Sequence, residues 1–154
     1  CYDHKDSGTP YLHKDGIMRG KGKLVPVDYR PSLESGDEDF PMILSTGRTL
    51  YHYNAATQTR FSGGTSIKQP EAFLQIHPRD ARFRDIIDGD FVEVKSRRGA
   101  LTCRAHITRE VNPGYAWMPF HFIEARANVL TNDEGDPVTG TAEYKVCAIE
   151  VSKN

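Results

Sequence analysis

The residues best placed to do chemistry lie in one polar loop, STGRTLYHYNAATQTR, which spans Ser45 to Arg60. This loop directly follows a short apolar run at 42–44, and it contains hydroxyls, a glycine, two arginines and a histidine. Such a loop suits a phosphorylated or strongly polar ligand, because Gly47 lets backbone N–H groups come close and Arg48 can pair with a diphosphate. The hydroxyls that could donate belong to Thr46, Thr57 and Thr59. By composition alone, the segment could equally be an ordinary polar surface loop.

A second candidate segment, PFHFIEARANVLTN, covers residues 119–132. His121 lies between two phenylalanines, and Asn128 and Asn132 offer paired donors and acceptors of the kind that read the edge of a heterocycle. The competing interpretation makes His121 a satisfied histidine at a strand end and Asn128 a capping residue. Lys145, at the start of the last predicted strand, could reach a ligand held at the rim of the fold, although a lone lysine there is more often simply solvated.

Covalent and metal chemistry find little support in the sequence. The six histidines are scattered without metal-ligand spacing, and no H-E-x-x-H, P-loop or G-x-S-x-G pattern occurs. Cys1, Cys103 and Cys147 form no C-x-x-C pair and leave an odd thiol, which argues against a zinc ribbon or a disulfide scaffold and fits a reducing cytoplasm. Cys103 and Cys147 fall on the apolar faces of predicted strands, so buried, unreactive thiols are expected.

The elements that must position the two loops are predicted to be short strands. Residues 101–108 alternate most clearly, with Leu101, Cys103, Ala105 and Ile107 on one face. This strand and 91–96 form a predicted hairpin, whose tip at Arg97 and Arg98 reads as a solvated turn without a site. Further strands are predicted at 42–44, 72–78, 115–120 and 144–151.

One helix is predicted to open at Pro78, with Asp80 near its positive end, and to close at the Asp88–Gly89 turn. About six strands with one clear helix and no strand-helix alternation indicate a small closed barrel rather than a doubly wound sheet. Residues 1–40 are rich in glycine and proline and contain the acidic stretch ESGDED, which predicts an extended arm ahead of a barrel domain at 41–154.

Composition narrows the class of protein. The chain has 154 residues, 38% of them hydrophobic, which predicts one globular domain. A formal net charge of -1 gives no reason to expect nucleic acid or an anionic membrane as a partner. No run approaches the roughly 18 to 20 apolar residues that span a bilayer. The first residues lack an initiator Met and show no secretory signal, which fits a cytoplasmic protein and a piece of a longer chain.

The order of these motifs resembles a known family. STGR, YHYNAATQTR, HPRDA, IDGDFVEVKSRRG, VNPGYAWMPFHF, ANVLTN and EYKVCAIEV follow one another as in the molybdopterin dinucleotide-binding C-terminal domain of formate dehydrogenase catalytic subunits, within the dimethyl sulfoxide reductase superfamily. The resemblance runs from about Pro41 to Val151, and YLHKDGIMRGKGKLVPVDYRP looks like the segment that leads into this domain. It implies a six-stranded double-psi β-barrel with a few short helices, the aspartate decarboxylase-like fold.

The resemblance also implies a site and a set of partners. The full subunit would hold two molybdopterin guanine dinucleotides with molybdenum or tungsten, and a 4Fe-4S cluster and the protein ligand of the metal would lie in other domains. An iron-sulfur electron-transfer subunit is a further implied partner, and the isolated chain is expected to be inactive. The implied cofactor contacts are Thr46, Gly47, Arg48, Tyr51, His52, Thr57, Thr59, His121, Phe122, Asn128, Thr131 and Lys145.

Three alternatives stand beside this interpretation. A non-catalytic double-psi barrel that recognises substrates for an ATPase has no reason to contain ANVLTN and YHYNAATQTR together. A self-processing decarboxylase barrel needs a Gly-Ser bond, and the chain contains none. A small natural subunit of a related molybdopterin enzyme, as in formylmethanofuran dehydrogenase, keeps the family but changes the assembly, and the lead-in arm argues for the larger chain.

Overall fold

The computed structural model describes residues 11, 13, 16–17 and 19–154, so Cys1 lies outside the described residues. The chain divides into two units, Cys1–Pro31 and Ser32–Asn154. In the first unit, residues 19–31 are exposed and form no helix or strand. The second unit begins ahead of the barrel strands and includes residues 32–40, which the sequence predicts as part of the arm.

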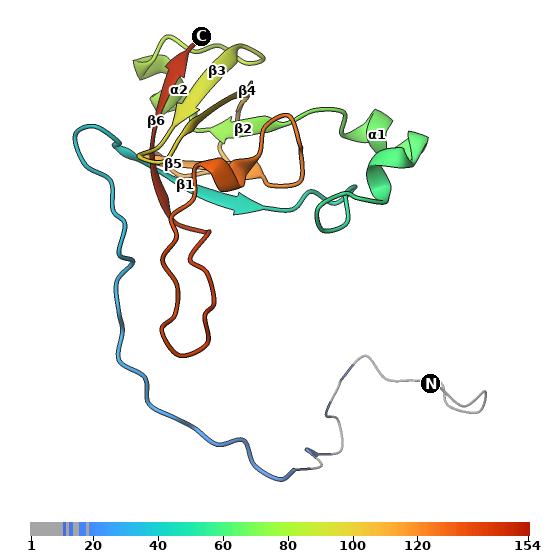
Figure 1. Ribbon diagram of the computed structural model, residues 1–154, viewed down its shortest axis with the longest axis vertical. Coiled ribbons are helices and arrows are strands. Elements are labelled where there is room, and N and C mark those ends of the chain that lie inside the picture. Colours follow the sequence, from blue (N-terminus) through green and yellow to red (C-terminus); the bar gives the residue numbers. More distant parts are fainter. Residues whose placement is uncertain (1–10, 12, 14–15, 18) are drawn as a thin grey trace. The chain divides into compact units, whose positions relative to one another are not determined.

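The second unit is a closed six-stranded barrel with the strand order β1-β5-β2-β4-β3-β6 (Figure 1). This arrangement confirms the predicted fold class. The strands are β1 (Met42–Gly47), β2 (Phe73–Ile76), β3 (Phe91–Lys95), β4 (Ala100–Ile107), β5 (Tyr115–Pro119) and β6 (Cys147–Lys153). The helices are short: α1 (Gly63–Lys68), α2 (Pro78–Phe83), and the 3-10 turns η1 (Thr59–Phe61) and η2 (Ala127–Val129). No helix in the described part of the chain is long and apolar enough to cross a membrane.

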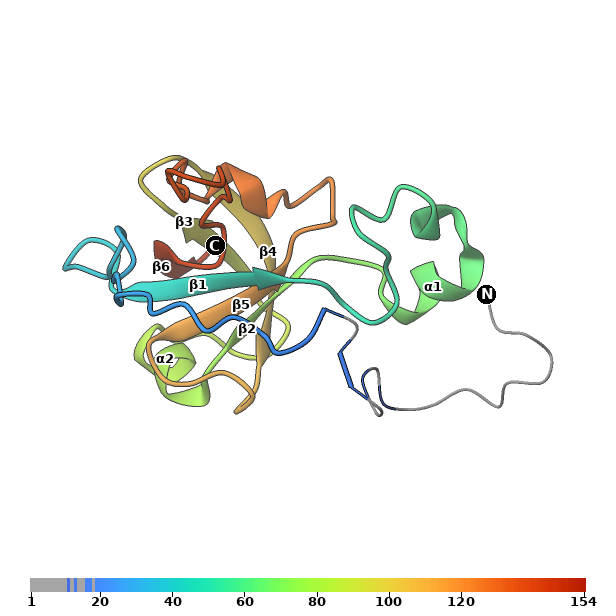
Figure 2. The same ribbon diagram turned by 90° about the horizontal axis from the view of Figure 1, so that it is seen from below.

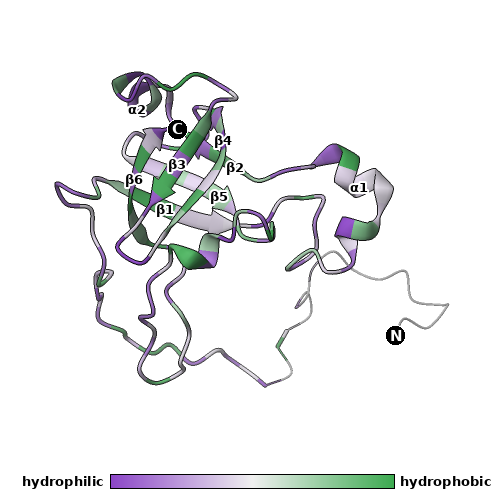
Figure 3. Ribbon diagram, turned by 45° about the horizontal axis from the view of Figure 1, so that its top comes forward, coloured by the Kyte–Doolittle hydropathy of each residue, from purple (hydrophilic) through white to green (hydrophobic). Residues whose placement is uncertain are grey.

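Apolar residues at alternate positions of β3 and β4 belong to the core of the barrel, and Figure 3 shows hydrophobic residues along β3 and β6. In β4 the predicted alternation is confirmed, because Cys103 and Ala105 are buried while Leu101 and Ile107 pack against the core. Burial raises the pKa of the Cys103 thiol to about 12, so this thiol stays protonated and inert, as predicted.

Helix α2 begins as predicted and ends earlier. Pro78 occupies the first turn, and the ring of His77 caps the helix by accepting a hydrogen bond from the Arg79 N–H at 3.1 Å. The helix stops at Phe83 rather than at the Asp88–Gly89 turn. Asp85 adopts a left-handed φ of 53°, and the N–H groups of Asp85 and Ile86 close the helix end on the carbonyls of Arg82 and Ala81.

Two parallel strand pairs, β1 with β5 and β2 with β4, decide where the candidate loops lie. Gly47 at the end of β1 is level with Pro119 at the end of β5. The segment after β1, which carries α1, therefore leaves the barrel beside the segment after β5 (Figure 2). The two loops that the sequence singled out share one end of the barrel, which we name the loop end: residues 48–72 and 120–132.

The tip of the β3–β4 hairpin corrects one expectation. Arg97 and Arg98 do not form a free solvated turn, because both donate hydrogen bonds to Glu34, at 3.2 Å and 2.8 Å. Arg97 also pairs with Asp37. The hydrogen bond from the Phe40 N–H, with Arg97 close by, holds the pKa of the Asp37 carboxyl below its ordinary value. The tip is therefore a contact between the barrel and residues 32–40.

Candidate functional site

The centre of the loop end is a cluster of three buried rings. His52 comes from the loop after β1, and His121 and Phe122 come from the segment after β5. The ring centroids lie 4.8 Å apart for His52 and His121, 4.5 Å for His121 and Phe122, and 5.6 Å for His52 and Phe122. Residues that are distant in the sequence thus meet because β1 and β5 run parallel side by side.

His52 is held from both sides. Its Nε2 lies 3.0 Å from the carbonyl oxygen of Gln69, which can only accept, so Nε2 carries a proton. Its Nδ1 lies 3.1 Å from the Thr59 hydroxyl, whose oxygen accepts a hydrogen bond from the Tyr53 N–H. Thr59 therefore supports His52 within this loop. The Gln69 carbonyl is a second support, and no local sequence pattern indicates it.

His121 is held on one side alone. Its side chain is 4% exposed, and Nε2 lies 3.4 Å from the Thr49 hydroxyl. The other ring nitrogen, Nδ1, is buried without any hydrogen-bond partner. Burial, together with the neighbouring His52, lowers the pKa of His121 to about 4. A neutral His121 can thus offer Nδ1 to a ligand as either donor or acceptor.

An open pocket of about 200 Å³ adjoins these rings. His52, His121 and Phe122 line it, together with Arg60 and Glu124. A buried polar atom without a partner costs about 1–3 kcal/mol, which a ligand that pairs with it would recover. The site therefore suits a polar heterocycle with a hydrogen-bonding edge.

A second group of predicted residues surrounds the end of β1. The Thr46 hydroxyl is buried and donates to the Tyr144 carbonyl at 2.8 Å, and the Lys145 ammonium donates to the Thr46 carbonyl. These contacts join the last residues of β1 to the approach of β6. Gly47 has a packing reason to be glycine, because a Cβ there would lie 2.5 Å from Nε1 of Trp117. The contact of Trp117 with Gly47 was not predicted, although the position of Trp117 in the strand pattern of β5 could have indicated it.

The remaining predicted contacts lie at the surface. Arg48 is exposed, with its guanidinium 5.7 Å from the centroid of the Phe120 ring beside His121. Tyr51 and Thr57 are exposed, and nothing in the structure joins them to the ring cluster. The Thr131 hydroxyl donates to the Asn128 carbonyl at 3.3 Å, so these two residues form a local turn.

The amide of Asn132 is already used within the barrel unit. It does not present a free amide edge, because its Nδ2 donates to Glu34 at 3.2 Å and to the Val146 carbonyl at 3.0 Å. Its Oδ1 accepts from the Glu134 N–H at 3.2 Å. With 9% of its surface exposed, Asn132 is a structural residue. Among the described residues, no group of three or more His, Cys, Asp or Glu side chains is arranged to hold a metal ion.

Comparison with known proteins agrees with this architecture. The sequence profile of the family described as "Molydopterin dinucleotide binding domain" matches residues 42–148. The chain is 44% identical to the F420-dependent formate dehydrogenase subunit alpha of Methanocaldococcus jannaschii and 43% identical to F420-dependent formate dehydrogenase 2 subunit alpha of Methanococcus maripaludis. Each alignment covers 99% of this chain and 23% of the relative, so the chain spans less than a quarter of their length.

Among solved structures, acetylene hydratase from Pelobacter acetylenicus superposes with a TM-score of 0.69 at 15% identity, over 76% of this chain and 19% of that one. The likeness concerns the fold alone.

The closed barrel defines the class as a double-psi β-barrel protein. The chain belongs to the molybdopterin dinucleotide-binding domain family, and it is homologous to the alpha subunits of formate dehydrogenases.

The residues at the loop end fit such a cofactor. His121 lines the pocket and keeps a buried, unpaired Nδ1, and Arg48 is an exposed cation over the neighbouring Phe120 ring. The pocket of about 200 Å³ could take one part of the cofactor.

Proposed function

We propose that this chain is the C-terminal cofactor-binding domain of a molybdenum or tungsten formate dehydrogenase. The observation that carries the proposal is the identity of 41–44% across 99% of the chain with three alpha subunits, each named as an F420-dependent formate dehydrogenase. Family membership also favours this function over the recognition-module alternative. The division into a lead-in arm and a cofactor-binding barrel, expected at 1–40 and 41–154, is part of the proposal, with residues 32–40 held to the barrel through Glu34 and Asp37.

The cofactor is a molybdopterin guanine dinucleotide, bound as a pair in the complete subunit. His52, His121 and Phe122 would receive a heterocyclic part of it, with Thr59 keeping His52 in place. Arg48 and Lys145 would meet its anionic part, and Thr46 and Gly47 would shape the rim at the end of β1. Tyr51, Thr57, Asn128 and Thr131 would form the outer contacts.

The bound metal and pterin supply the two-electron chemistry that oxidises formate to carbon dioxide, while the protein supplies orientation and electrostatics. The chain's own part is to hold the cofactor and keep water from the buried ring cluster. A 4Fe-4S cluster elsewhere in the subunit and an iron-sulfur partner subunit would carry the electrons onward, to F420 by the relatives' names. The proposed location is the cytoplasm, and the isolated chain is expected to be inactive.

Cofactor content of the complete subunit tests this function. The purified subunit should contain two pterin guanine dinucleotides with molybdenum or tungsten, measured by pterin fluorescence after oxidation, released GMP and elemental analysis. It should also reduce F420 with formate when assembled with its partners. A folded subunit, expressed in a host that loads a known enzyme, with no pterin would refute the proposal.

The site assignment has its own test at Arg48. Replacing Arg48 by alanine removes a charge-assisted contact worth about 1.5–3 kcal/mol to the bound anion, so cofactor occupancy should fall while turnover per bound metal stays nearly unchanged. Arg109→Ala is the matched control, because Arg109 is also exposed but lies beyond the end of β4, next to α2. Full metal content with reduced turnover in Arg48→Ala would contradict the assignment.

A further inference from the structure

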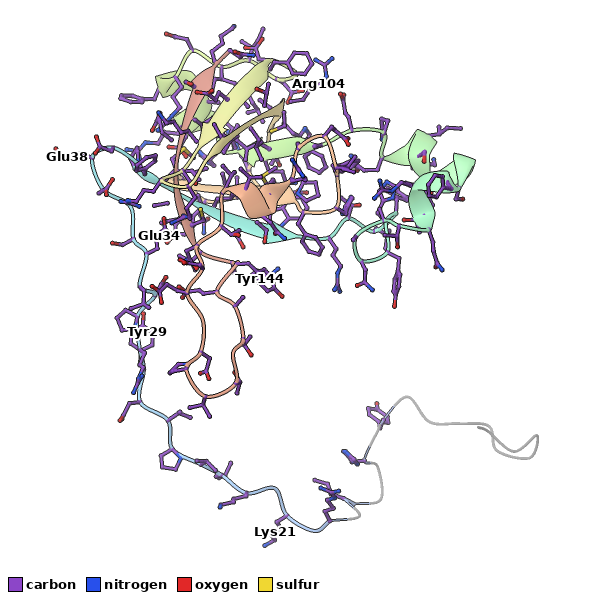
Figure 4. All side chains as sticks on the ribbon, in the orientation of Figure 1. Lys21, Tyr29, Glu34, Glu38, Arg104 and Tyr144 are labelled. Carbon is purple, nitrogen blue, oxygen red and sulfur yellow. The ribbon has the colours of Figure 1, made fainter. Side chains whose placement is uncertain are left out.

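A buried carboxylate outside the family match joins several parts of the barrel. Glu34 has 9% of its surface exposed, and it precedes the matched residues 42–148. Its two oxygens accept hydrogen bonds from the Arg98 guanidinium at 2.8 and 2.9 Å, from Asn132 at 3.2 Å and from the Ala148 N–H at 3.1 Å. Figure 4 shows Glu34 beside the barrel, while Glu38 lies at the outer bend of the same segment.

Arg98 continues this connection to the segment that follows η2. While one amino group binds Glu34, its Nε donates to the Leu130 carbonyl at 2.9 Å. The Cys147 thiol donates to the same carbonyl at 2.8 Å and lies 3.2 Å from the Arg98 guanidinium. At the neighbouring position, a Cβ on Gly99 would lie 2.6 Å from a methyl group of Val129, so the hairpin tip packs tightly on η2.

Glu34 also fixes both ends of the excursion between η2 and β6. Asn132 opens this excursion, and it binds Glu34 and the Val146 carbonyl at once. Ala148, just past its other end, donates its backbone N–H to Glu34. The same excursion carries Lys145 to the end of β1.

The electrostatics make the two ions depend on each other. Burial alone would raise the pKa of Glu34, but hydrogen bonds from Arg98, Ala148 and Asn132 hold this pKa below its ordinary value. Burial opposes the charge of Arg98 as well, and Glu34 restores its high pKa. Loss of Glu34 would leave the partly buried Arg98 without its carboxylate partner, whereas loss of Arg98 would leave Glu34 paired with Arg97 alone.

We propose that Glu34, acting through Arg98, is a positioning residue for the part of the cofactor site formed by Asn128 and Thr131. The contacts of Glu34 and Arg98 with Asn132 and Leu130 keep residues 129–132 in one conformation, so that Asn128 and Thr131 face the cofactor. The functional unit therefore begins at Ser32, ahead of the family match. The part of this inference that concerns the cofactor rests on the proposed function, whereas the ordering of residues 129–132 does not.

Hydrogen exchange in the 154-residue chain tests the ordering. Glu34→Gln keeps the shape but turns an amide N–H₂ toward the donors of Arg98 and Asn132, and amide exchange at 129–132 and 146–148 should accelerate about ten-fold or more. Glu150→Gln is the matched control, because Glu150 also binds one arginine with both oxygens, at 3.1 Å each, but pairs with Arg84 beside α2.

Arg97→Ala should leave exchange at 129–132 unchanged, since Arg97 contacts Glu34 and Asp37 but not Leu130. Unchanged exchange in Glu34→Gln, or equal acceleration in the Glu150→Gln control, would overturn the inference.

Cofactor retention in the complete subunit tests the consequence. Glu34→Gln should speed the loss of pterin on dilution about ten-fold, equivalent to about 1.4 kcal/mol, whereas Glu150→Gln with a comparable drop in melting temperature should not. Faster exchange with normal retention would overturn the positioning role and leave the proposed function standing. Failure of the proposed function has a different signature, because the unsubstituted subunit would then contain no pterin.

Discussion

The barrel has two ends, the loop end and the opposite end that carries α2, which we name the α2 end. They differ in how their polar groups are hydrogen-bonded. At the α2 end, His77 caps the helix, Asp80 accepts a hydrogen bond from the Gly114 N–H at 2.8 Å, and Arg84 binds Glu150 at 3.1 Å. At the loop end, the buried Nδ1 of His121 has no partner. Native proteins pair nearly all buried polar atoms, and among the described residues the two exceptions, His121 Nδ1 and Glu143 Oε2, both lie away from α2. The proposed ligand site therefore lies at the end where a buried ring nitrogen remains unpaired, and we expect polar contacts at the α2 end to serve stability.

The largest expected effect belongs to the core that both ends share. Leu74→Ala deletes a fully buried side chain and should lower the free energy of unfolding by about 2–5 kcal/mol. Urea denaturation of the 154-residue chain measures this loss. Leu50→Ala, at a position 93% exposed in the loop after β1, is the control and should leave stability nearly unchanged. A small loss at Leu74 would mean that the ends do not share one core.

The loop end should also show itself in the dependence of stability on pH. Because the pKa of folded His121 is about 4, the unfolded chain binds the extra proton between about pH 6.5 and 4. The free energy of unfolding should therefore fall as the pH falls through this window, by on the order of 3 kcal/mol from this residue. Urea denaturation measured from pH 7 to pH 4 should show a smaller fall in the free energy of unfolding for His121→Phe than for the unsubstituted chain. Identical pH profiles for the two proteins would remove the evidence for a buried neutral ring.

Comparison with the sequence predictions shows which of these features are local. The β4 alternation and the Pro78 helix start follow from periodicity and backbone chemistry, and both were confirmed. The partner of Arg97 and Arg98 could not be predicted, because Glu34 lies 63 and 64 residues away in the sequence. The contact forms only once the barrel has closed.

The same limit applied to the candidate site. His52 and His121 were each singled out, but their meeting depends on the parallel pairing of β1 with β5, which no local pattern encodes. The amide of Asn132 was considered for the edge of a heterocycle, and its chemistry is equally suited to the Glu34 carboxylate that it binds. Residue types thus identified the loops, and the tertiary partners decided which side chains remain available.

At the α2 end, removal of a polar partner should affect stability alone. Arg84→Ala breaks hydrogen bonds to Glu150 and to the Val151 carbonyl, which should cost about 2 kcal/mol of folding free energy. Denaturation of the 154-residue chain measures the cost, and pterin content of the complete subunit measures the effect on the cofactor. Pterin content per folded subunit should be unchanged. A specific loss of pterin would show that the two ends are not independent.

The smallest expected effect concerns backbone strain at the loop end. Ala56 is buried with a left-handed φ of 56°, in the loop between His52 and Thr59. A non-glycine residue pays about 1–2 kcal/mol for this conformation, and glycine loses part of that gain through its larger unfolded entropy, so Ala56→Gly should stabilise by about 0.5 kcal/mol. Ala81→Gly in α2 is the control and should destabilise, because a helical residue gains nothing from glycine. Destabilisation by Ala56→Gly would mean that packing of the alanine methyl group beside the pocket outweighs the strain.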